Sequence, residues 1–147
     1  MRRVLASLII VAGFALAVTA TGNAAGGAAT VKTRHGELGT FLTGTNGRTL
    51  YLFEKDKTKK STCADACATA WPPLLTTGKP NAAGKAKTSL IGTTKRADGK
   101  TQVTYKGHPV YYFVQDKKPG DTKGQGVDGF GAEWYVMSPS GKKIDDD

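Results

Sequence analysis

The stretch "GRTLYLFEKD" at Gly47–Asp56 recurs further along the chain as "GHPVYYFVQD" at Gly107–Asp116. Each copy has a tyrosine, a phenylalanine two positions later and an aspartate three positions after that. Side chains alternate along a β-strand, so the tyrosine and the phenylalanine face one side while apolar neighbours face the other. This pattern predicts two central strands that are covered on both faces. The motif residues are Tyr51, Phe53 and Asp56 in the first copy, and Tyr111, Phe113 and Asp116 in the second.

The similarity between the two halves extends beyond this motif. "LGT" at Leu38–Thr40 matches "IGT" at Ile91–Thr93, and "WPPL" at Trp71–Leu74 matches "WYVM" at Trp134–Met137. Such an internal duplication indicates two copies of one structural unit. Asn46-Gly47 predicts a tight hairpin turn in which both residues have positive φ. We therefore expect a mainly β fold, in which two pseudo-symmetric repeats form a small sandwich or a partly closed barrel.

The segment "TCADACATAW" interrupts this β pattern. It is rich in alanine and predicts one short helix, with Thr62 as its N-cap and with Pro72 and Pro73 ending it. Cys63 and Cys67 are the two cysteines of the chain. In an exported protein, an isolated pair this close indicates a disulfide, which would stabilise a local turn rather than the whole fold.

The first 25 residues have the pattern of a secretory signal peptide. Arg2 and Arg3 precede an apolar run, and small residues follow it. An uncleaved membrane anchor is the alternative, because the apolar run approaches the roughly 17 residues that can span a bilayer. The remaining segments are expected to be a flexible leader at 26–37, a single β-rich domain at 38–141 with repeats at 38–75 and 89–139 around a connector at 76–88, and a polar tail at 142–147.

The composition is basic, with 21 lysines and arginines against 12 acidic residues and a net charge of +9. Without Arg2 and Arg3 the balance is 19 against 12, or +7. Outside the cell, such a protein meets anionic wall polymers, lipid headgroups and acidic proteins. The expected partners are therefore anionic cell-wall polymers or envelope proteins, although scattered lysines also suit a soluble surface without a partner. No motif supports binding to nucleic acid.

Two interpretations of the repeated motif remain open. In the structural one, the aromatic residues form the core, and the aspartate accepts backbone N–H groups where each strand ends. In the functional one, two equivalent Asp and Tyr clusters line a shared ligand groove. Trp71 and Trp134, which follow the motif in each half, could likewise belong to the core, serve electron transfer or stack on a flat cofactor.

The sequence does not assemble a catalytic set. His35 lies in a polar stretch near the start of the mature chain, and His108 is a lone histidine in the turn "KGHPV". The expected disulfide removes the thiolate that a cysteine nucleophile needs. If the cysteines were reduced, they could bind a soft metal together with His108 or Met137. No cofactor is expected, and copper or haem handling in envelope electron transfer is the alternative function.

Several segments together carry a resemblance to a known family. They are "LYLFEKD", "STCADACATAWPPL", "RADGKTQVTYKGHPVYYFVQDKKPGDTKGQGV" and the final tryptophan strand. The chain resembles a bacterial family of secreted repeats of unknown function, also described as predicted lipoproteins with a Tyr-x-aromatic-x-x-Asp motif. The resemblance covers about Leu38 to Gly141. Members of that family often carry a lipid-anchoring cysteine after the signal peptide, and this sequence has none there, so we expect no lipid anchor. The resemblance implies an exported protein but no specific role. From the basic surface and the lack of a catalytic set we expect a binding or interaction module, extracellular or associated with the envelope.

Overall fold

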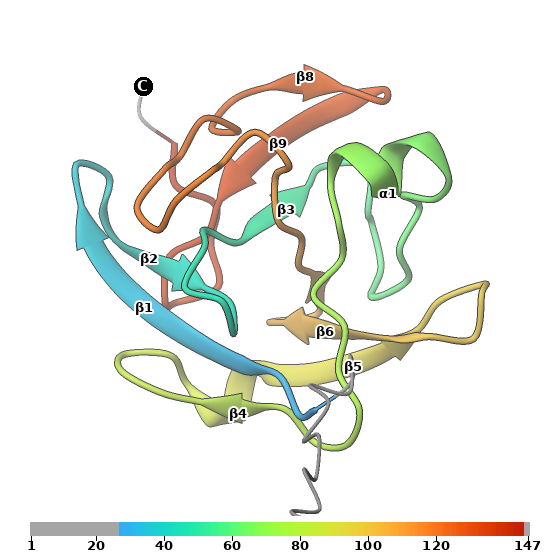
Figure 1. Ribbon diagram of the computed structural model, residues 1–147, viewed down its shortest axis with the longest axis horizontal. Helices are drawn as coiled ribbons and strands as arrows, with labels where there is room; N and C mark the ends of the chain where they lie inside the picture. The colour runs from blue at the N-terminus through green and yellow to red at the C-terminus, as the bar shows by residue number, and fades with distance from the viewer. Residues whose placement is uncertain (1–26, 146–147) are drawn as a thin grey trace, which may run out of the picture.

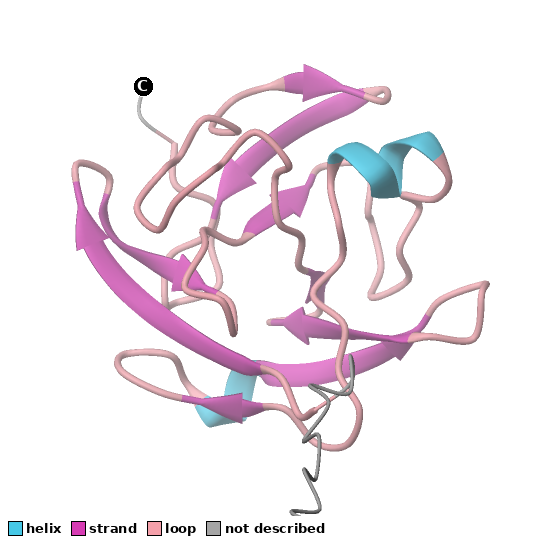
Figure 2. Ribbon diagram, in the orientation of Figure 1, coloured by secondary structure: helices cyan, strands magenta, loops and turns pink. Residues whose placement is uncertain are grey.

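The computed structural model describes residues 27–145, and the expected signal peptide lies outside them. The fold is mainly β, as predicted, with short strands joined by long loops (Figures 1 and 2). The elements are β1 (Thr30–Gly36), β2 (Gly39–Thr43), β3 (Tyr51–Phe53), α1 (Ala66–Ala70), β4 (Asn81–Ala82), a 3-10 turn η1 (Thr88–Leu90), β5 (Ile91–Lys95), β6 (Thr101–Tyr105), β7 (His108–Pro109), β8 (Asp128–Gly129) and β9 (Ala132–Val136). In this part of the chain the strands form three small sheets, ordered β2-β1-β4, β5-β6-β7 and β3-β9-β8, which do not close into a barrel.

Each repeat begins with an antiparallel hairpin, β1 with β2 and β5 with β6. Leu50 N–H donates to the carbonyl of Leu42 in β2 at 2.9 Å, and Val110 N–H donates to the carbonyl of Val103 in β6 at 3.2 Å. These equivalent hydrogen bonds make β2 the counterpart of β6, and β1 the counterpart of β5. The predicted match of "LGT" with "IGT" is therefore wrong, because the first triplet leads into the second strand of its hairpin and the other begins the first strand.

Alternation along the two motif strands separates two hydrophobic clusters. Tyr51 and Phe53 face one cluster, whereas Leu50 and Leu52 face the other. We call the first the Trp cluster, which contains Phe41, Tyr51, Phe53, Cys63, Cys67, Trp71, Tyr111, Phe113, Trp134 and Val136. We call the second the Leu–Val cluster, which contains Ala29, Val31, Leu42, Leu50, Leu52, Leu74, Val103, Tyr105, Val110, Tyr135 and Met137. Both motif copies are thus buried on both faces, as the period of two predicts. The prediction of two central strands is wrong for the second copy, since residues 110–113 form no strand and Tyr111 makes only isolated bridges with Tyr51 and Pro73.

The segment after each tryptophan crosses to the other repeat. In the second repeat this segment is β9, which pairs with β3 so that Val136 lies opposite Tyr51 (Figure 1). In the first repeat the equivalent position is Pro73, which forms an isolated bridge with Tyr111. Prolines lack the backbone N–H that a ladder needs, so Pro72 and Pro73 limit this crossing to isolated bridges, the other one joining Leu75 and Gln102. Each repeat therefore completes the sheet of the other.

The segment preceding Leu38 is not the flexible leader that the sequence suggested. Residues Thr30–Gly36 form β1, which lies between β2 and β4 in its sheet. The pattern was hard to recognise because only Ala29 and Val31 are apolar and buried there. The expected connector is also anchored, since β4 pairs in parallel with β1 and the Thr76 hydroxyl accepts Ala29 N–H at 2.9 Å.

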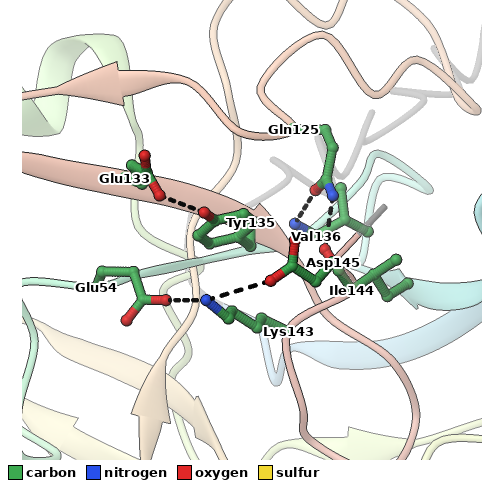
Figure 3. Close-up of polar contacts among 8 residues, drawn as sticks. All are labelled: Glu54, Gln125, Glu133, Tyr135, Val136, Lys143, Ile144 and Asp145. Atoms are coloured by element: carbon green, nitrogen blue, oxygen red, sulfur yellow. Dashed lines mark hydrogen bonds and ion pairs between the residues drawn. The ribbon is translucent and has the colours of Figure 1, made fainter. Parts of the chain in front are cut away.

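The expected polar tail is held against β9 as far as Asp145 (Figure 3). The Gln125 side chain accepts Val136 N–H at 2.8 Å and donates to the carbonyl of Ile144 at 2.6 Å. Ile144 N–H in turn donates to the Val136 carbonyl at 2.8 Å. These bonds join the C-terminal segment to the second repeat, so residues 142–145 belong to the folded domain.

The helix starts later than predicted. Thr62 does not cap it, because the N–H and the hydroxyl of Thr62 both donate to Asp56 Oδ1 at 2.7 Å. The residue before the helix is Asp65, which has a positive φ of 55° and makes no side-chain capping bond. Within residues 27–145, no helix is long and apolar enough to cross a membrane.

The predicted turn at Asn46-Gly47 also differs. Gly47 has a φ of 80°, but Asn46 does not have positive φ. The Asn46 side-chain oxygen accepts Arg48 N–H at 2.9 Å, which favours a longer loop between the bridged residues Thr43 and Thr49. A tight turn with two positive φ values is found instead at Lys106-Gly107, between β6 and β7.

Candidate functional site

The two motif tyrosines meet at the centre of the molecule. Tyr51 N–H donates to the carbonyl of Tyr111 at 2.8 Å, and Tyr111 N–H donates to the carbonyl of Tyr51 at 3.0 Å. This reciprocal bridge joins equivalent positions of the two repeats and marks their pseudo-twofold relation. Both side chains are fully buried in the Trp cluster.

Each motif tyrosine bonds to the aspartate of the other repeat. The Tyr51 hydroxyl donates to Asp116 Oδ2 and the Tyr111 hydroxyl donates to Asp56 Oδ2, both at 2.6 Å. The sequence groups each tyrosine with the aspartate five positions after it, but the fold exchanges these partners. The repeated motif is therefore an interlock between the two repeats, and the carboxylates do not line an open groove because both aspartates are buried.

The second oxygen of each carboxylate holds the loop that follows its strand. Asp56 Oδ1 accepts Thr62 N–H at 2.7 Å, and Asp116 Oδ1 accepts Lys123 N–H at 2.9 Å. Such bonds to backbone N–H groups satisfy a buried carboxylate without a cation. Each aspartate thus ends its strand, orders the next loop and bonds to the opposite repeat.

The phenol groups are kept protonated by their surroundings. Burial, followed by the hydrogen bond to Asp116, raises the pKa of Tyr51 far above its ordinary value. Burial and the charge of Asp56 do the same for the pKa of Tyr111. Burial also raises the pKa of Asp116. Both tyrosines therefore remain protonated hydrogen-bond donors at neutral pH.

The four large rings of the Trp cluster form one stacked column. Trp71 and Trp134 stack with their centroids 3.9 Å apart and their planes within 2°. Phe53 stacks on Trp134 at 4.0 Å, and Phe113 stacks on Trp71 at 4.0 Å. Each phenylalanine thus packs on the tryptophan of the other repeat, which is the same exchange that the tyrosines and aspartates make.

The two cysteines form the predicted disulfide beside this column. The Cys63 and Cys67 sulfurs are 2.02 Å apart, and both side chains are buried. Arg96 from the β5–β6 turn holds the same loop: its guanidinium donates to the Cys63 carbonyl at 2.6 Å and to the Ser61 hydroxyl at 3.0 Å. The Ser61 hydroxyl lies 2.7 Å from the Tyr111 hydroxyl. The sequence analysis missed Arg96, because nothing in the neighbouring sequence indicates a contact with Cys63, 33 positions earlier.

The metal candidates of the sequence are not brought together. Met137 is buried in the Leu–Val cluster, on the opposite side of the motif strands from the disulfide. His108 is half-buried in β7 and borders Lys106 and Lys143. In residues 27–145 there is no group of three or more histidine, cysteine or acidic side chains that could hold a metal ion.

An open surface with several exposed lysines lies over the β5–β6 hairpin. We call it the basic groove: three adjoining pockets that share Thr93, Lys95 or Thr101. Its lysines are Lys59, Lys60, Lys79, Lys95 and Lys100, and all are exposed. Within residues 27–145, no acidic side chain lines it. The nearest carboxylate on the hairpin, Asp98, accepts the backbone N–H of Lys100 at 2.9 Å.

These lysines contrast with Lys143 on another face (Figure 3). Lys143 Nζ lies 2.9 Å from Glu54 and 3.6 Å from Asp145, and the bond to Glu54 raises the pKa of the ammonium group. On the same face, Tyr135 donates to Glu133, and this bond raises the pKa of the phenol to about 12. Within the described residues, Lys143 is the one cation that forms an ion pair, so the groove lysines have no carboxylate partner.

Fold and site together define a class: an intertwined two-repeat β protein whose duplicated aromatic motif forms a shared core. A family model described as "Secreted repeat of unknown function" matches the chain twice, at residues 32–75 and 92–138. The two matches cover more than half of the chain, which therefore belongs to this family, as the sequence motifs predicted. The family's description as secreted supports an extracytoplasmic location. No curated protein and no solved structure matches the chain.

Proposed function

We propose that the protein is an extracytoplasmic binding module whose basic groove holds an anionic polymer of the cell surface. The observation that carries this proposal is the grouping of five exposed lysines around adjoining pockets that no acidic residue lines. The interlocked motif contributes indirectly, since it makes the two repeats one rigid support for the groove. The buried motif residues themselves do not contact the polymer.

Electrostatics explain why a polymer suits this surface. Like charges that are gathered on one face repel each other and attract a layer of counterions. A polyanion that replaces several counterions at once gains the entropy of their release, and this gain falls as the salt concentration rises. The groove lies along a hairpin and is open to solvent, so an extended chain could pass over it without unfolding any element.

The triple variant Lys79→Ala, Lys95→Ala and Lys100→Ala is expected to bind anionic wall polymer at least ten-fold more weakly than the wild type. For the wild-type protein, raising the salt from about 0.05 M to about 0.2 M should weaken binding about a hundred-fold if five contacts are made, by analogy with other polyanions. Co-sedimentation with purified wall material or fluorescence anisotropy of a labelled polymer measures both effects.

The matched control separates the position of the charges from their number. The variant Lys32→Ala, Lys118→Ala and Lys142→Ala removes the same charge from exposed lysines that do not border the groove. This control should keep nearly wild-type affinity and salt dependence. Equal losses in the two triple variants would show that binding follows net charge alone, and would contradict the groove.

A second candidate function is that of an accessory protein for envelope electron transfer or for copper or haem handling. The column of four stacked rings favours it, because closely packed aromatic rings can relay an electron between sites. Under this function, protein purified from its own host would carry a stoichiometric metal or haem, detected by elemental analysis or by a visible absorption band. A colourless, metal-free preparation that binds wall polymer would contradict it.

A further inference from the structure

We propose that the end of the basic groove beside Lys59 and Lys60 is a pocket for a phosphate group, so that the polymer held there is a phosphodiester chain. This inference rests on the proposed function and specifies the chemistry of its ligand. The pocket has a volume of about 320 Å³ and is lined by Lys59, Lys60, Thr93, Thr94, Lys95 and Thr101. We call it the phosphate pocket.

The first independent observation is an unsatisfied hydroxyl on a residue that lines this pocket. Thr94 is 4 % exposed, and its Oγ1 is the one buried side-chain nitrogen or oxygen atom of residues 27–145 that has no hydrogen-bond partner. A buried polar group without a partner costs about 1–3 kcal/mol, and such groups are rare in folded proteins. Thr94 lines the pocket together with three exposed lysines, Lys59, Lys60 and Lys95. Its hydroxyl has almost no accessible surface, so a rotation of the Thr94 side chain would bring it to an oxyanion held by these lysines.

The second observation is the free edge of β5. This strand pairs with β6 alone, and the bonds from Arg96 N–H to Lys100 and from Lys106 N–H to Leu90 set the phase of the ladder. Because bonded pairs alternate along an antiparallel ladder, the N–H groups of Thr93 and Lys95 point away from β6. No hydrogen bond within the described residues occupies these two donors. Both residues line the phosphate pocket.

The donor set favours phosphate over carboxylate. An arginine fork matches a planar carboxylate, whereas lysine acts as a point charge with three donors and is a common phosphate ligand. The cations of the phosphate pocket are all lysines, and hydroxyl and backbone N–H donors surround them. The four oxygens of a phosphodiester can accept from several such directions at once. The row of lysines at Lys79, Lys95 and Lys100 would then follow successive phosphates of the same chain.

The Thr94→Val variant tests the pocket with inorganic phosphate as the probe. Titrations of the secreted protein at constant ionic strength, followed by amide NMR, should shift the resonances of Thr93–Lys95 and Lys59–Ser61 with phosphate but not with acetate. Thr94→Val should bind phosphate about ten-fold more weakly, because it removes a hydrogen bond to a charged group. Its melting temperature should stay equal or rise, since the variant also removes an unsatisfied hydroxyl. Thr94→Ser, which keeps a hydroxyl, should bind phosphate like the wild type.

A second pair of variants keeps the test independent of folding. Lys59→Ala with Lys60→Ala changes only exposed side chains and should reduce phosphate binding, whereas Lys118→Ala with Lys142→Ala should not. Wild-type phosphate affinity in Thr94→Val, or equal losses in the two lysine pairs, would overturn the phosphate pocket.

Polymer binding separates the failure of this inference from that of the proposed function. The wild type should bind poly(glycerol phosphate) more tightly than poly(glutamate), and Thr94→Val should lose that preference. If both polymers bind equally to the wild type and to Thr94→Val, the groove is a general polyanion site and the phosphate pocket is wrong. If neither polymer binds, the proposed function is wrong. If only vesicles containing phosphatidylglycerol bind, the phosphate belongs to a lipid headgroup, and the proposal of a polymer ligand is wrong.

Discussion

The Trp134→Ala variant is expected to lose about 3–5 kcal/mol of unfolding free energy, the usual cost of truncating a buried tryptophan. Trp134 is fully buried and stacks on both Phe53 and Trp71. Its ring therefore contacts the first repeat on both faces, and the variant opens a cavity at the junction of the two repeats. Small domains are stable by only about 5–15 kcal/mol, so this loss would leave a protein close to unfolding.

Urea unfolding followed by tryptophan fluorescence and by circular dichroism measures this loss. The matched control is Phe130→Ala, because Phe130 is an aromatic residue of the same repeat with 46 % of its surface exposed. That variant should change the unfolding free energy by no more than about 0.5 kcal/mol. A loss below about 1.5 kcal/mol for Trp134→Ala would contradict the description of the ring column as the joint core.

The exchanged Tyr–Asp pairs are expected to give coupling energies of about 1–3 kcal/mol in double-mutant cycles. One cycle combines Tyr51→Phe with Asp116→Asn, and the other combines Tyr111→Phe with Asp56→Asn. Each pair is joined by a buried hydrogen bond of 2.6 Å to a carboxylate, and bonds to charged groups are the stronger kind. Each single variant should be clearly destabilising, because it leaves a buried partner unsatisfied.

The control for these cycles uses the same four substitutions in the other combination. Tyr51→Phe with Asp56→Asn, and Tyr111→Phe with Asp116→Asn, pair residues of the same repeat that share no hydrogen bond. Their coupling should fall to about 0.5 kcal/mol or less. Larger coupling within a repeat than between repeats, measured by urea unfolding, would show that each motif works alone and that the interlock is wrong.

Some local features were predictable because they depend on short-range geometry. The first motif strand, the two apolar faces of both motif copies and the disulfide between Cys63 and Cys67 follow from the period of two and from the spacing of two cysteines. The errors occurred where a tertiary bond overrode a local preference. Thr62 bonds to Asp56 rather than capping the helix, and Asn46 uses its side chain on Arg48 instead of adopting positive φ. The strand β1 was missed because Val31 is its one apolar buried residue, so its sequence resembles a polar leader.

The candidate groove could not be located from the sequence either. The excess of positive charge is visible in the composition, and the hypothesis of an anionic partner rests on it. The composition does not show that Lys59 and Lys60 from one loop line the same pocket as Lys95 of β5, because Lys95 comes 35 positions after Lys60. Nor does it mark Thr94, whose hydroxyl lacks a partner only because of the elements packed around it.

The sequence by itself determined that this protein is a duplicated, secreted-type β chain with a repeated aromatic and acidic motif. These properties can be recognised from residues that are close together in the sequence, because such residues determine the strand period and the chemistry of turns. Only the tertiary structure decided that Tyr51 bonds to Asp116 rather than to Asp56, that Phe53 stacks on Trp134, and that the lysines gather over β5 and β6. The physical reason is that two equivalent copies offer equivalent partners, and the choice between them depends on which packing of the whole chain buries both sets of rings and satisfies both carboxylates.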